Sequence, residues 1–386
     1  MTEFEEELLD DIDKVMMSSS SVRRPLTAVV LAAGEGTRMH SSLPKPLHKL
    51  CGHSMILYVL EALGGLPIDR VVVVVGHGAE IVTKTVHASA PAEFNIEFVE
   101  QPSQRGTGDA VAVALTAIPD HIESGVDGDV IVLPGDTPLL RSSTLMRLVK
   151  EHRTFDAAAS LLTAKVNDPT GYGRVLRNKH DEIVRIIEHL DASVAEKEID
   201  EVCTSIYVFK HSVLGPALRR LLPENSQKEY YLTDVVEVLS SAGYKVISNL
   251  VKDPMEAAGV NDRSQLAIAE AELRDRTNER WMRSGVTMLD PERCYVDSTV
   301  ELSEDVTLYP GTILEGNTKI SKGAKIGPDT RLVDCYVGEG AVVMSTVGFF
   351  AEIGENSKVG PFAVLEPGTR IVQNLTTGPF YRAAED

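Results

Sequence analysis

The hydrophobic pattern divides the chain into two regions with different periods. Up to about residue 260, short runs of β-branched and aliphatic residues alternate with longer amphipathic stretches. The runs 27–33 (TAVVLAA), 70–75 (RVVVVV) and 129–133 (DVIVL) are almost continuously apolar, as is typical of strands buried on both faces of a parallel sheet. Stretches between them, such as 54–63 and 109–115, are helix-like. The first region therefore predicts an α/β fold, with a mostly parallel sheet and helices on both sides.

A six-residue repeat dominates the second region. An aliphatic residue recurs at every sixth position, at Val296, Leu302, Leu308, Leu314, Ile320, Ile326 and Leu332. Four positions after each comes a residue that is nearly always small or β-branched, at Val300, Val306, Thr312, Thr318, Ala324, Thr330 and Tyr336. The phase then slips and resumes at Ile353, Val359, Leu365 and Ile371. This pattern predicts a short left-handed parallel β-helix of hexapeptide repeats, and eleven recognisable hexads at three per coil predict fewer than four coils.

A helix-forming stretch separates the two regions. Residues 263–283 are rich in Ala, Leu, Glu and Arg and contain neither Gly nor Pro, which predicts one connector helix. The 386 residues therefore divide into an acidic flexible tail at 1–25, an α/β domain at 26–260, a connector helix and linker at 261–290, and a truncated β-helix at 291–386.

Composition narrows the class of protein. The formal net charge of -19 argues against DNA or RNA as a partner. The four cysteines, Cys51, Cys203, Cys294 and Cys335, lie far apart, which favours reduced thiols in a cytoplasmic protein over a disulfide framework or a zinc site. No apolar run approaches the roughly 18 residues that span a bilayer, and the acidic N-terminus does not read as a signal peptide. We therefore expect no membrane insertion.

A glycine-containing loop directly follows the first apolar run. Gly34 and Gly36 stand in the sequence GEGTR, where backbone N–H groups past the end of a parallel strand can approach phosphates. The spacing fits neither the dinucleotide fingerprint nor a Walker loop, and a glycine pair alone is also compatible with a simple tight turn. Arg38 and Lys45 add two cations suited to phosphate oxygens. Together these features favour a phosphate-binding loop.

These segments resemble a known family. LAAGEGTRM at 31–39 and LPKPLH at 43–48 look like the signature of sugar nucleotidyltransferases. More narrowly, the chain is similar to the bacterial bifunctional N-acetylglucosamine-1-phosphate uridylyltransferase/glucosamine-1-phosphate acetyltransferase family over about residues 26–370. The supporting segments are RGTGDA (105–110), GDTPLL (135–140), GYGRVLR (171–177), IIEH (186–189), QKEYYLTD (227–234) and GVNDR (259–263). The resemblance implies a Rossmann-like nucleotidyltransferase domain followed by the hexapeptide β-helix.

The resemblance also implies a reaction and its residues. UTP and N-acetylglucosamine-1-phosphate would give UDP-N-acetylglucosamine and pyrophosphate with Mg²⁺, for cell-wall precursor synthesis. Arg38, Lys45 and Asp136 would act in catalysis, and Asp136 and Asn261 would hold the metal. Gln101, Gly106 and Thr107 would read the uracil, and Gly173 and Glu188 would meet the sugar. The implied substrate-binding set is Leu31, Ala32, Ala33, Gly34, Lys45, Gln101, Gly106, Thr107, Gly135, Asp136, Gly173, Glu188 and Asn261.

Two departures from the family pattern change the expectation. Cys203 stands in EVCTSIYVF where the family has Asn, and cysteine is a poor hydrogen-bond partner, so one sugar contact or contact near the metal is in question. Glu366, in LEPGT, occupies the position of an arginine in the acetyltransferase site, and the chain ends at Asp386 before the segments that would carry the remaining acetyltransferase residues. We therefore expect the β-helix to be a structural module that forms a homotrimer, without acetyltransferase activity.

Two other functions stay open at this point. One is nucleotidyl transfer to a different sugar-1-phosphate. The other is a non-catalytic scaffold that binds a UDP-sugar, against which the joint presence of Arg38, Lys45, Asp136 and Asn261 argues.

Overall fold

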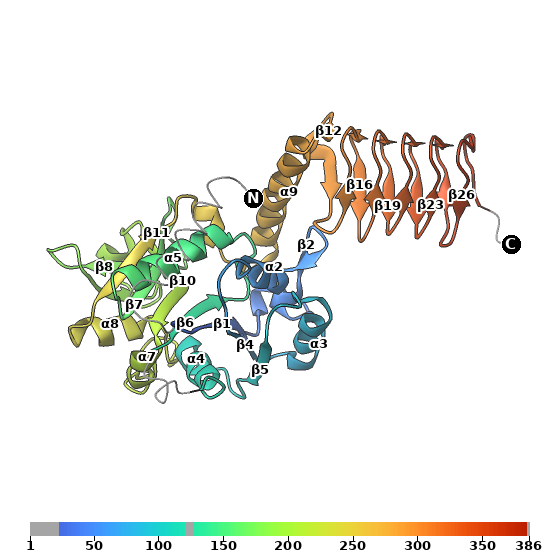
Figure 1. Ribbon diagram of the computed structural model, residues 1–386. Helices are drawn as coiled ribbons and strands as arrows, with labels where there is room; N and C mark the ends of the chain where they lie inside the picture. Colours follow the sequence, from blue (N-terminus) through green and yellow to red (C-terminus); the bar gives the residue numbers. More distant parts are fainter. Residues whose placement is uncertain (1–22, 120–126, 384–386) are drawn as a thin grey trace. The chain divides into compact units, whose positions relative to one another are not determined.

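The computed structural model describes residues 23–119 and 127–383. Most of the acidic tail predicted at 1–25 lies outside these residues. These residues form two compact units: described residues within 23–48 and 54–265 make up the first, and residues 49–53 and 266–383 make up the second (Figure 1). No helix among the described residues is long and apolar enough to cross a membrane.

A nine-stranded sheet forms the centre of the first unit (Figure 1). Its main path is β11–β7–β10–β6–β1–β4–β5, while β8 pairs with β10 and with β9. Strands β6, β1, β4 and β5 are mutually parallel, and β10 is antiparallel to β6, β7 and β8. The strands are β1 (Leu26–Ala32), β4 (Arg70–Val75), β5 (Ile96–Glu100), β6 (Asp129–Pro134), β7 (Ala159–Lys165), β8 (Gly173–Arg177), β9 (Ile183–Ile187), β10 (Glu201–Lys210) and β11 (Val246–Leu250). The predicted parallel-rich α/β fold is confirmed.

Helices cover both faces of this sheet. Successive residues of a strand point to opposite faces, so neighbouring residues of one strand belong to different cores. Val30 of β1 belongs to the core that contains residues of α2, α3 and α5, whereas its neighbour Val29 belongs to the core that contains residues of α4, α7 and α8. The helices are α2 (Met55–Ala62), α3 (Ala79–Ser89), α4 (Thr107–Leu115), α5 (Ser142–Thr154), α6 (Val194–Lys197), α7 (His211–Leu218) and α8 (Asp234–Ser241), with 3-10 turns η1 (Thr37–Met39), η2 (Lys45–Leu47) and η4 (Pro254–Ala257). Burial on both faces explains the nearly continuous apolar runs.

The predicted connector is one helix, α9 (Arg263–Arg283), with the predicted bounds. After it, short strands stack into three parallel sheets, each of five strands. These sheets contain β12 (Thr287–Met288), β15 (Thr307–Leu308), β18 (Lys325–Ile326), β21 (Val342–Val343) and β24 (Lys358–Val359); then β13 (Cys294–Val296), β16 (Thr312–Glu315), β19 (Arg331–Val333), β22 (Val347–Phe349) and β25 (Val364–Leu365); and β14 (Glu301–Leu302), β17 (Lys319–Ile320), β20 (Tyr336–Val337), β23 (Glu352–Ile353) and β26 (Arg370–Ile371). The unit also contains η5 (Pro291–Arg293) and the hairpin of β2 (Lys49–Leu50) and β3 (His53–Ser54), of which Ser54 lies at the boundary.

The stacked sheets are the predicted left-handed parallel β-helix, and the repeat positions account for its core. Leu302, Ile320, Val337, Ile353 and Ile371 are buried and follow one another in register through one sheet. Buried threonines and alanines fill the corners between the aliphatic layers, among them Thr312, Thr318, Ala324, Thr330 and Thr346.

Two details of the repeat were predicted wrongly. Tyr336 was expected at a small, inward position, but its side chain is 49% exposed and Cys335 is buried in its place. The step from Leu332 to Val337 has five residues, as do the steps from Val343 to Gly348 and from Gly348 to Ile353, and each of them shifts the later positions by one. The helix also has five strands on each face, so the estimate of fewer than four coils was too low. A search for aliphatic residues at a fixed phase misses coils that contain five-residue steps or carry Gly348 at the inward position.

Candidate active site

A cavity of about 570 Å³ opens at the carboxyl ends of β1 and β6 in the first unit. In parallel sheets this edge is where loops bring ligand-binding groups together. The structure brings every residue of the predicted set to this cavity: Leu31, Ala32, Ala33, Gly34, Arg38, Lys45, Gln101, Gly106, Thr107, Gly135, Asp136, Gly173, Glu188 and Asn261 all line it. What each of them binds remains a prediction.

The loop after β1 is shaped by Gly36. Its φ of 63° lies in the left-handed region, and a Cβ there would lie 2.6 Å from the Cβ of Lys45. Only glycine permits this combination without strain, so the loop can turn tightly against η2. At Gly34, by contrast, a Cβ would meet no atom within 4 Å, so this part of the backbone borders open space. The loop therefore presents bare backbone to the cavity, as phosphate binding requires.

Two cations converge on two oxygen-bearing side chains in the middle of the cavity. The Lys45 ammonium forms an ion pair with Asp136 and donates to Asn261 Oδ1 at 2.8 Å. Arg38 Nη2 donates to the same Asn261 oxygen at 3.0 Å. Gly135 N donates to Leu31 O at 2.8 Å and so holds Asp136 beside the end of β1. Asn261 N in turn donates to Gln265 Oε1 at 2.7 Å, which fixes the start of this segment.

The donors at this point fit a magnesium ion better than a transition metal. Asp136 supplies a carboxylate and Asn261 an amide oxygen, and a Cβ on Gly259 would lie 3.7 Å from both Asp136 Oδ1 and Asn261 Nδ2. Among the described residues, no cluster of three or more His, Cys, Asp or Glu side chains could form a complete protein cage for a metal. Mg²⁺ is typically held by one or two protein oxygens together with substrate phosphates and water.

The end of the cavity at α4 carries an oriented amide. Gln101 Nε2 donates to Asp109 Oδ2 at 2.8 Å and to the carbonyl of Gly106 at 3.1 Å. Both amide hydrogens are thereby used, so the Gln101 carbonyl oxygen is the group left to face a ligand. Gly106 has a φ of 106°, and a Cβ there would lie 2.5 Å from Tyr230 O, so glycine is required where the chain enters α4.

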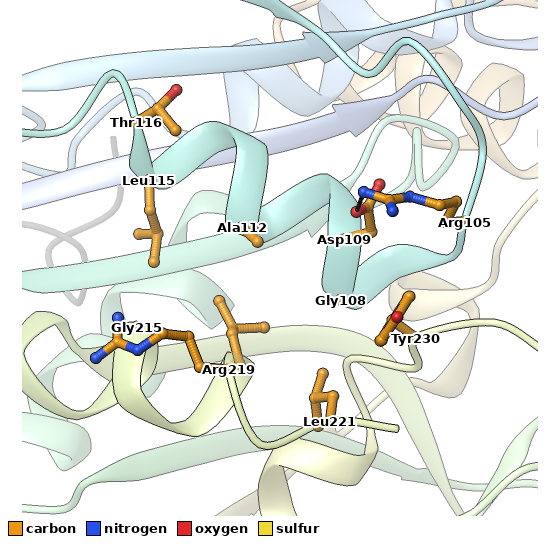
Figure 2. A pocket seen from close by; sticks show the side chains of 11 residues that line it. Arg105, Gly108, Asp109, Ala112, Leu115, Thr116, Gly215, Arg219, Leu221 and Tyr230 are labelled. Atoms are coloured by element: carbon orange, nitrogen blue, oxygen red, sulfur yellow. Dashed lines mark hydrogen bonds and ion pairs between the residues drawn. The ribbon is translucent and has the colours of Figure 1, made fainter. Parts of the chain in front are cut away.

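A second, smaller cleft of about 410 Å³ lies beyond the first turn of α4 (Figure 2). Arg105 and Asp109 lie together on the α4 side, joined by an ion pair of 2.6 Å, while Arg219 and Leu221 line the other side. Asp109 thus contacts Arg105 with one carboxylate oxygen and Gln101 with the other. Asp109 therefore connects Arg105, which lines this cleft, with Gln101, which lines the main cavity.

Another part of the cavity is lined by residues of β8 and β10 and by the residue after β9. In the sheet register Gly173 pairs with Cys203 of β10, and Glu188 directly follows the strand β9 that pairs with β8. A Cβ on Gly173 would lie 2.8 Å from Ile186 Cγ2 and 3.6 Å from both carboxylate oxygens of Glu188. A side chain at position 173 would therefore displace the wall.

Burial governs the electrostatics of this wall. Burial raises the pKa of Glu188, an effect that the hydrogen bond from Thr233 at 3.0 Å opposes and that nearby Asp191 reinforces. Burial likewise raises the pKa of Cys203 to about 12, so its thiol is neutral at ordinary pH. The Cys203 thiol donates to the Tyr207 hydroxyl at 3.2 Å. The sequence did not predict this bond, because it showed only that a cysteine stands where the family has an asparagine.

Several cavity residues were not predicted from the sequence. Tyr172, Gln104 and Gln265 line it, and Gln104 Nε2 donates to Ala33 O at 2.7 Å, bracing the phosphate loop. Gln265 lies one turn into α9, where a helical pattern gives no sign of a site. Tyr172 could have been predicted from the sequence, since it lies inside GYGR next to the predicted Gly173.

Comparison with known proteins agrees with this architecture. Residues 27–256 match the family model described as nucleotidyl transferase. The chain is 45% identical over 355 residues to the bifunctional protein GlmU of Pelotomaculum thermopropionicum, covering 92% of this chain and 75% of that protein. It is 43% identical over 364 residues to the bifunctional protein GlmU of Streptomyces coelicolor, covering 94% and 74%.

The α/β fold, the cavity at its strand ends and the match over 27–256 define a nucleotidyltransferase. At 45% and 43% identity over more than nine-tenths of its length, the chain belongs to the family of bifunctional GlmU proteins.

Proposed function

We propose that this enzyme is a UDP-N-acetylglucosamine pyrophosphorylase, which joins UTP to N-acetylglucosamine-1-phosphate, releases pyrophosphate and so supplies a cell-wall precursor. One observation carries the proposal. The two cations and two oxygen ligands, Lys45 and Arg38 with Asp136 and Asn261, contact one another in a cavity that is also lined by an amide that can read a base and a carboxylate that can accept from a sugar.

The chemistry requires two anions to meet. A phosphate oxygen of the sugar phosphate forms a bond to the α-phosphorus of UTP, and the bond from that phosphorus to the bridging oxygen of pyrophosphate breaks. Neutralisation of charge and in-line positioning dominate such a reaction. Arg38 and Lys45 offset the charge of the phosphates, and the bare backbone at Gly34 permits close approach. Mg²⁺, held by Asp136 and Asn261, would supply further positive charge to the phosphate oxygens.

Gln101 supports the choice of a uracil base. Its free carbonyl oxygen can accept a hydrogen bond from the N3–H of uracil, whereas cytosine has an acceptor at N3. A site whose buried polar group is left unpaired by the wrong ligand discriminates strongly. We therefore expect UTP to be preferred over CTP.

Cys203 keeps a second candidate open within the same class. Its thiol lies in the wall that would face the sugar and already donates to Tyr207, so it offers a sugar hydroxyl little in return. Transfer to a different sugar-1-phosphate therefore remains the alternative.

The second unit is proposed to be a structural module. Glu366, at the position where the resemblance expects an arginine, lies 3.4 Å from Arg382 in an ion pair and presents a negative charge. A carboxylate is the wrong sign for binding a sugar phosphate, so we propose no acetyltransferase activity. We also propose that the enzyme is a cytoplasmic homotrimer assembled through this unit.

The deciding experiment is pyrophosphate release from UTP, N-acetylglucosamine-1-phosphate and Mg²⁺, with controls lacking sugar phosphate or containing EDTA. Release that depends on both sugar and metal supports the proposal. Pyrophosphate release only with another sugar phosphate would favour the alternative substrate. No release with any pair of nucleotide and sugar phosphate would favour a scaffold that binds UDP-sugar.

Asp136→Ala should lower turnover at least about a hundredfold, because it removes the only proposed carboxylate ligand of Mg²⁺. Its thermal unfolding midpoint should stay within a few degrees of wild type, because Asp136 lies in the cavity rather than in a core. Turnover near the wild-type rate would contradict the metal assignment.

A further inference from the structure

Arg174 is a buried cation that the proposed reaction does not use. Only 1% of its surface is exposed, and its Nε has no hydrogen-bond partner among residues 23–119 and 127–383. Burial lowers the pKa of its guanidinium, and the nearby charge of Asp168 opposes this effect. A charge is costly to bury unless it makes specific bonds, so the contacts of this side chain indicate what it does.

The register of the sheet puts Arg174 directly behind the wall of the cavity. Gly173 lines the cavity together with its sheet partner Cys203 and the nearby Glu188. Arg174 is the next residue, paired with Ile187 and Val202, and alternate residues of a strand point to opposite faces. Its side chain therefore leaves on the far side of the wall and does not reach the cavity.

From that side the guanidinium binds both strands that flank the wall. One nitrogen, Nη1, donates to the carbonyl of Tyr172, the residue before Gly173. The other, Nη2, lies 3.3 Å from His189 Nδ1, the residue after Glu188, and 3.5 Å from the carbonyl of Lys197. Tyr172 and His189 stand at the open end of the β8–β9 hairpin, so these bonds fix the spacing between Gly173 and Glu188.

The same clamp extends toward the proposed metal ligands. The Tyr172 hydroxyl lies near the backbone of Gly259, two residues before Asn261, and Tyr172, Gly259 and Asn261 all line the cavity. Tyr172 thus lies between the hairpin and the segment that carries Asn261. By donating to the carbonyl of Tyr172, Arg174 restrains Tyr172 on the side of the hairpin.

We propose that Arg174 is a positioning residue for the sugar phosphate: it acts through Tyr172 and His189 to keep the Gly173–Glu188 wall at the spacing that the sugar requires. The inference rests on the proposed function, because it assigns the wall to the sugar. At the base end, the Gln101 amide donates to Gly106 and Asp109, neither of which is among the residues that Arg174 binds.

Arg174→Met tests the clamp. Methionine keeps an unbranched apolar stem that reaches about as far as the arginine Nε and removes the buried charge together with its bonds, and such a replacement is often tolerated by a fold. We expect the KM for the sugar phosphate to rise about tenfold or more, while the KM for UTP stays within about twofold. Arg174→Lys, which keeps a cation and a donor, should recover part of the loss.

Arg177→Met is the matched control. Arg177 lies on the same strand, farther from the cavity, and binds Glu201 and Ser248. The Arg177→Met substitution should leave the KM for the sugar phosphate unchanged. Equal effects at Arg174 and Arg177, or a loss of thermal stability and kcat at Arg174 with both KM values unchanged, would overturn the proposal in favour of a structural role.

A binding measurement separates this inference from the proposed function. Calorimetry with UDP and with UDP-N-acetylglucosamine gives the affinity added by the sugar, without turnover. Arg174→Met should remove most of that increment and Arg177→Met none, even if the wild-type enzyme prefers another sugar phosphate as substrate. An increment that Arg174→Met leaves intact, or no increment in the wild type, would overturn the clamp. If Arg174→Met does not fold, His189→Ala and Arg174→Lys carry the same comparison.

Discussion

Lys45 occupies the position on which the charge balance of the cavity depends. Its ammonium is shared between Asp136 and Asn261, and Arg38 reaches the same asparagine. An ammonium on a flexible stem can exchange partners more readily than a guanidinium can. We expect Lys45 to move from Asp136 to a phosphate oxygen when a nucleotide and its metal arrive, since both compete for the same carboxylate.

Cys203 is the residue because of which the sequence alone does not decide the sugar substrate. Cys203→Asn adds an amide that can bond a sugar hydroxyl in the wall beside Gly173. One neutral hydrogen bond contributes about 1 kcal/mol, so the KM for N-acetylglucosamine-1-phosphate should fall about fivefold. The KM for UTP should not change, since Gln101 is held by Gly106 and Asp109 and not by Cys203. Steady-state kinetics with each substrate varied in turn provides the measurement, and an unchanged or raised KM for this sugar would point to another sugar as the natural substrate.

At the scale of elements, the first turn of α4 is where the two clefts meet. Asp109 binds Arg105 with one oxygen (Figure 2) and orients Gln101 with the other. The hydrogen bond to Gln101 is largely enclosed, since only 10% of the Asp109 side chain is exposed, whereas 62% of the Arg105 side chain is exposed. The bond to Gln101 should therefore matter more than the surface ion pair.

Asp109→Ala should raise the KM for UTP about three- to tenfold, because the Gln101 amide loses the partner that orients it. The KM for the sugar phosphate should stay within about twofold. Arg105→Ala is the control: it removes the exposed ion pair but leaves the bond between Asp109 and Gln101 in place. Initial rates with UTP varied at saturating sugar phosphate give the comparison. A larger effect from Arg105→Ala would mean that the second cleft, rather than the amide, governs nucleotide binding.

The start of α8 predicts a dependence of stability on pH. Burial, reinforced by Glu188, Glu237 and Asp191, raises the pKa of Asp234 from 3.8 to about 6. Between about pH 4 and 6 the folded state therefore holds a proton that the unfolded state releases, so stability falls as pH rises through this window and levels off above it.

Asp234→Asn cannot titrate, so it should gain stability relative to the wild type as pH rises from about 4 to 7. Urea unfolding midpoints measured across that range provide the test. Glu237→Gln, an exposed change on the same helix, removes only one of the neighbouring charges and leaves the burial of Asp234 in place, so it should keep most of the wild-type dependence on pH. Parallel curves for the wild type and Asp234→Asn would show that the carboxyl titrates near its usual pKa.

The sequence predicted what depends on local period and failed where spacing changed. The buried strands and the connector helix were predictable because β-branched runs and a stretch free of Gly and Pro carry their own signal. Tyr336 was misplaced because a five-residue step leaves no mark except a shifted phase. The site residues were recovered through family resemblance, whereas the Cys203–Tyr207 bond and the clamp at Arg174 depend on strand pairing between distant segments.

At the scale of the whole molecule, each unit has its own hydrophobic core, and the second unit also exposes apolar residues. Val347 and Val364, on the neighbouring strands β22 and β25, are each 38% exposed. At one corner beside this sheet Phe362 and Phe380 stack, with ring centroids 5.2 Å apart, and are 58% and 75% exposed. Contiguous exposed apolar surface of this kind favours association with another protein surface.

We expect this face to contact a second copy of the chain in the proposed trimer. One chain has a mass of 41.9 kDa, so sedimentation at micromolar concentration should give about three times that value. Replacing Phe362 and Phe380 together by Asp should dissociate the assembly, because burying two carboxylates in an apolar contact is costly. Tyr336→Asp is the control, an exposed aromatic on β20 in a different sheet, and should leave the trimer intact. Pyrophosphate release per chain should be similar in all three proteins, since the proposed site lies wholly within the first unit. A wild-type monomer, or dissociation by Tyr336→Asp alone, would assign the apolar face another role.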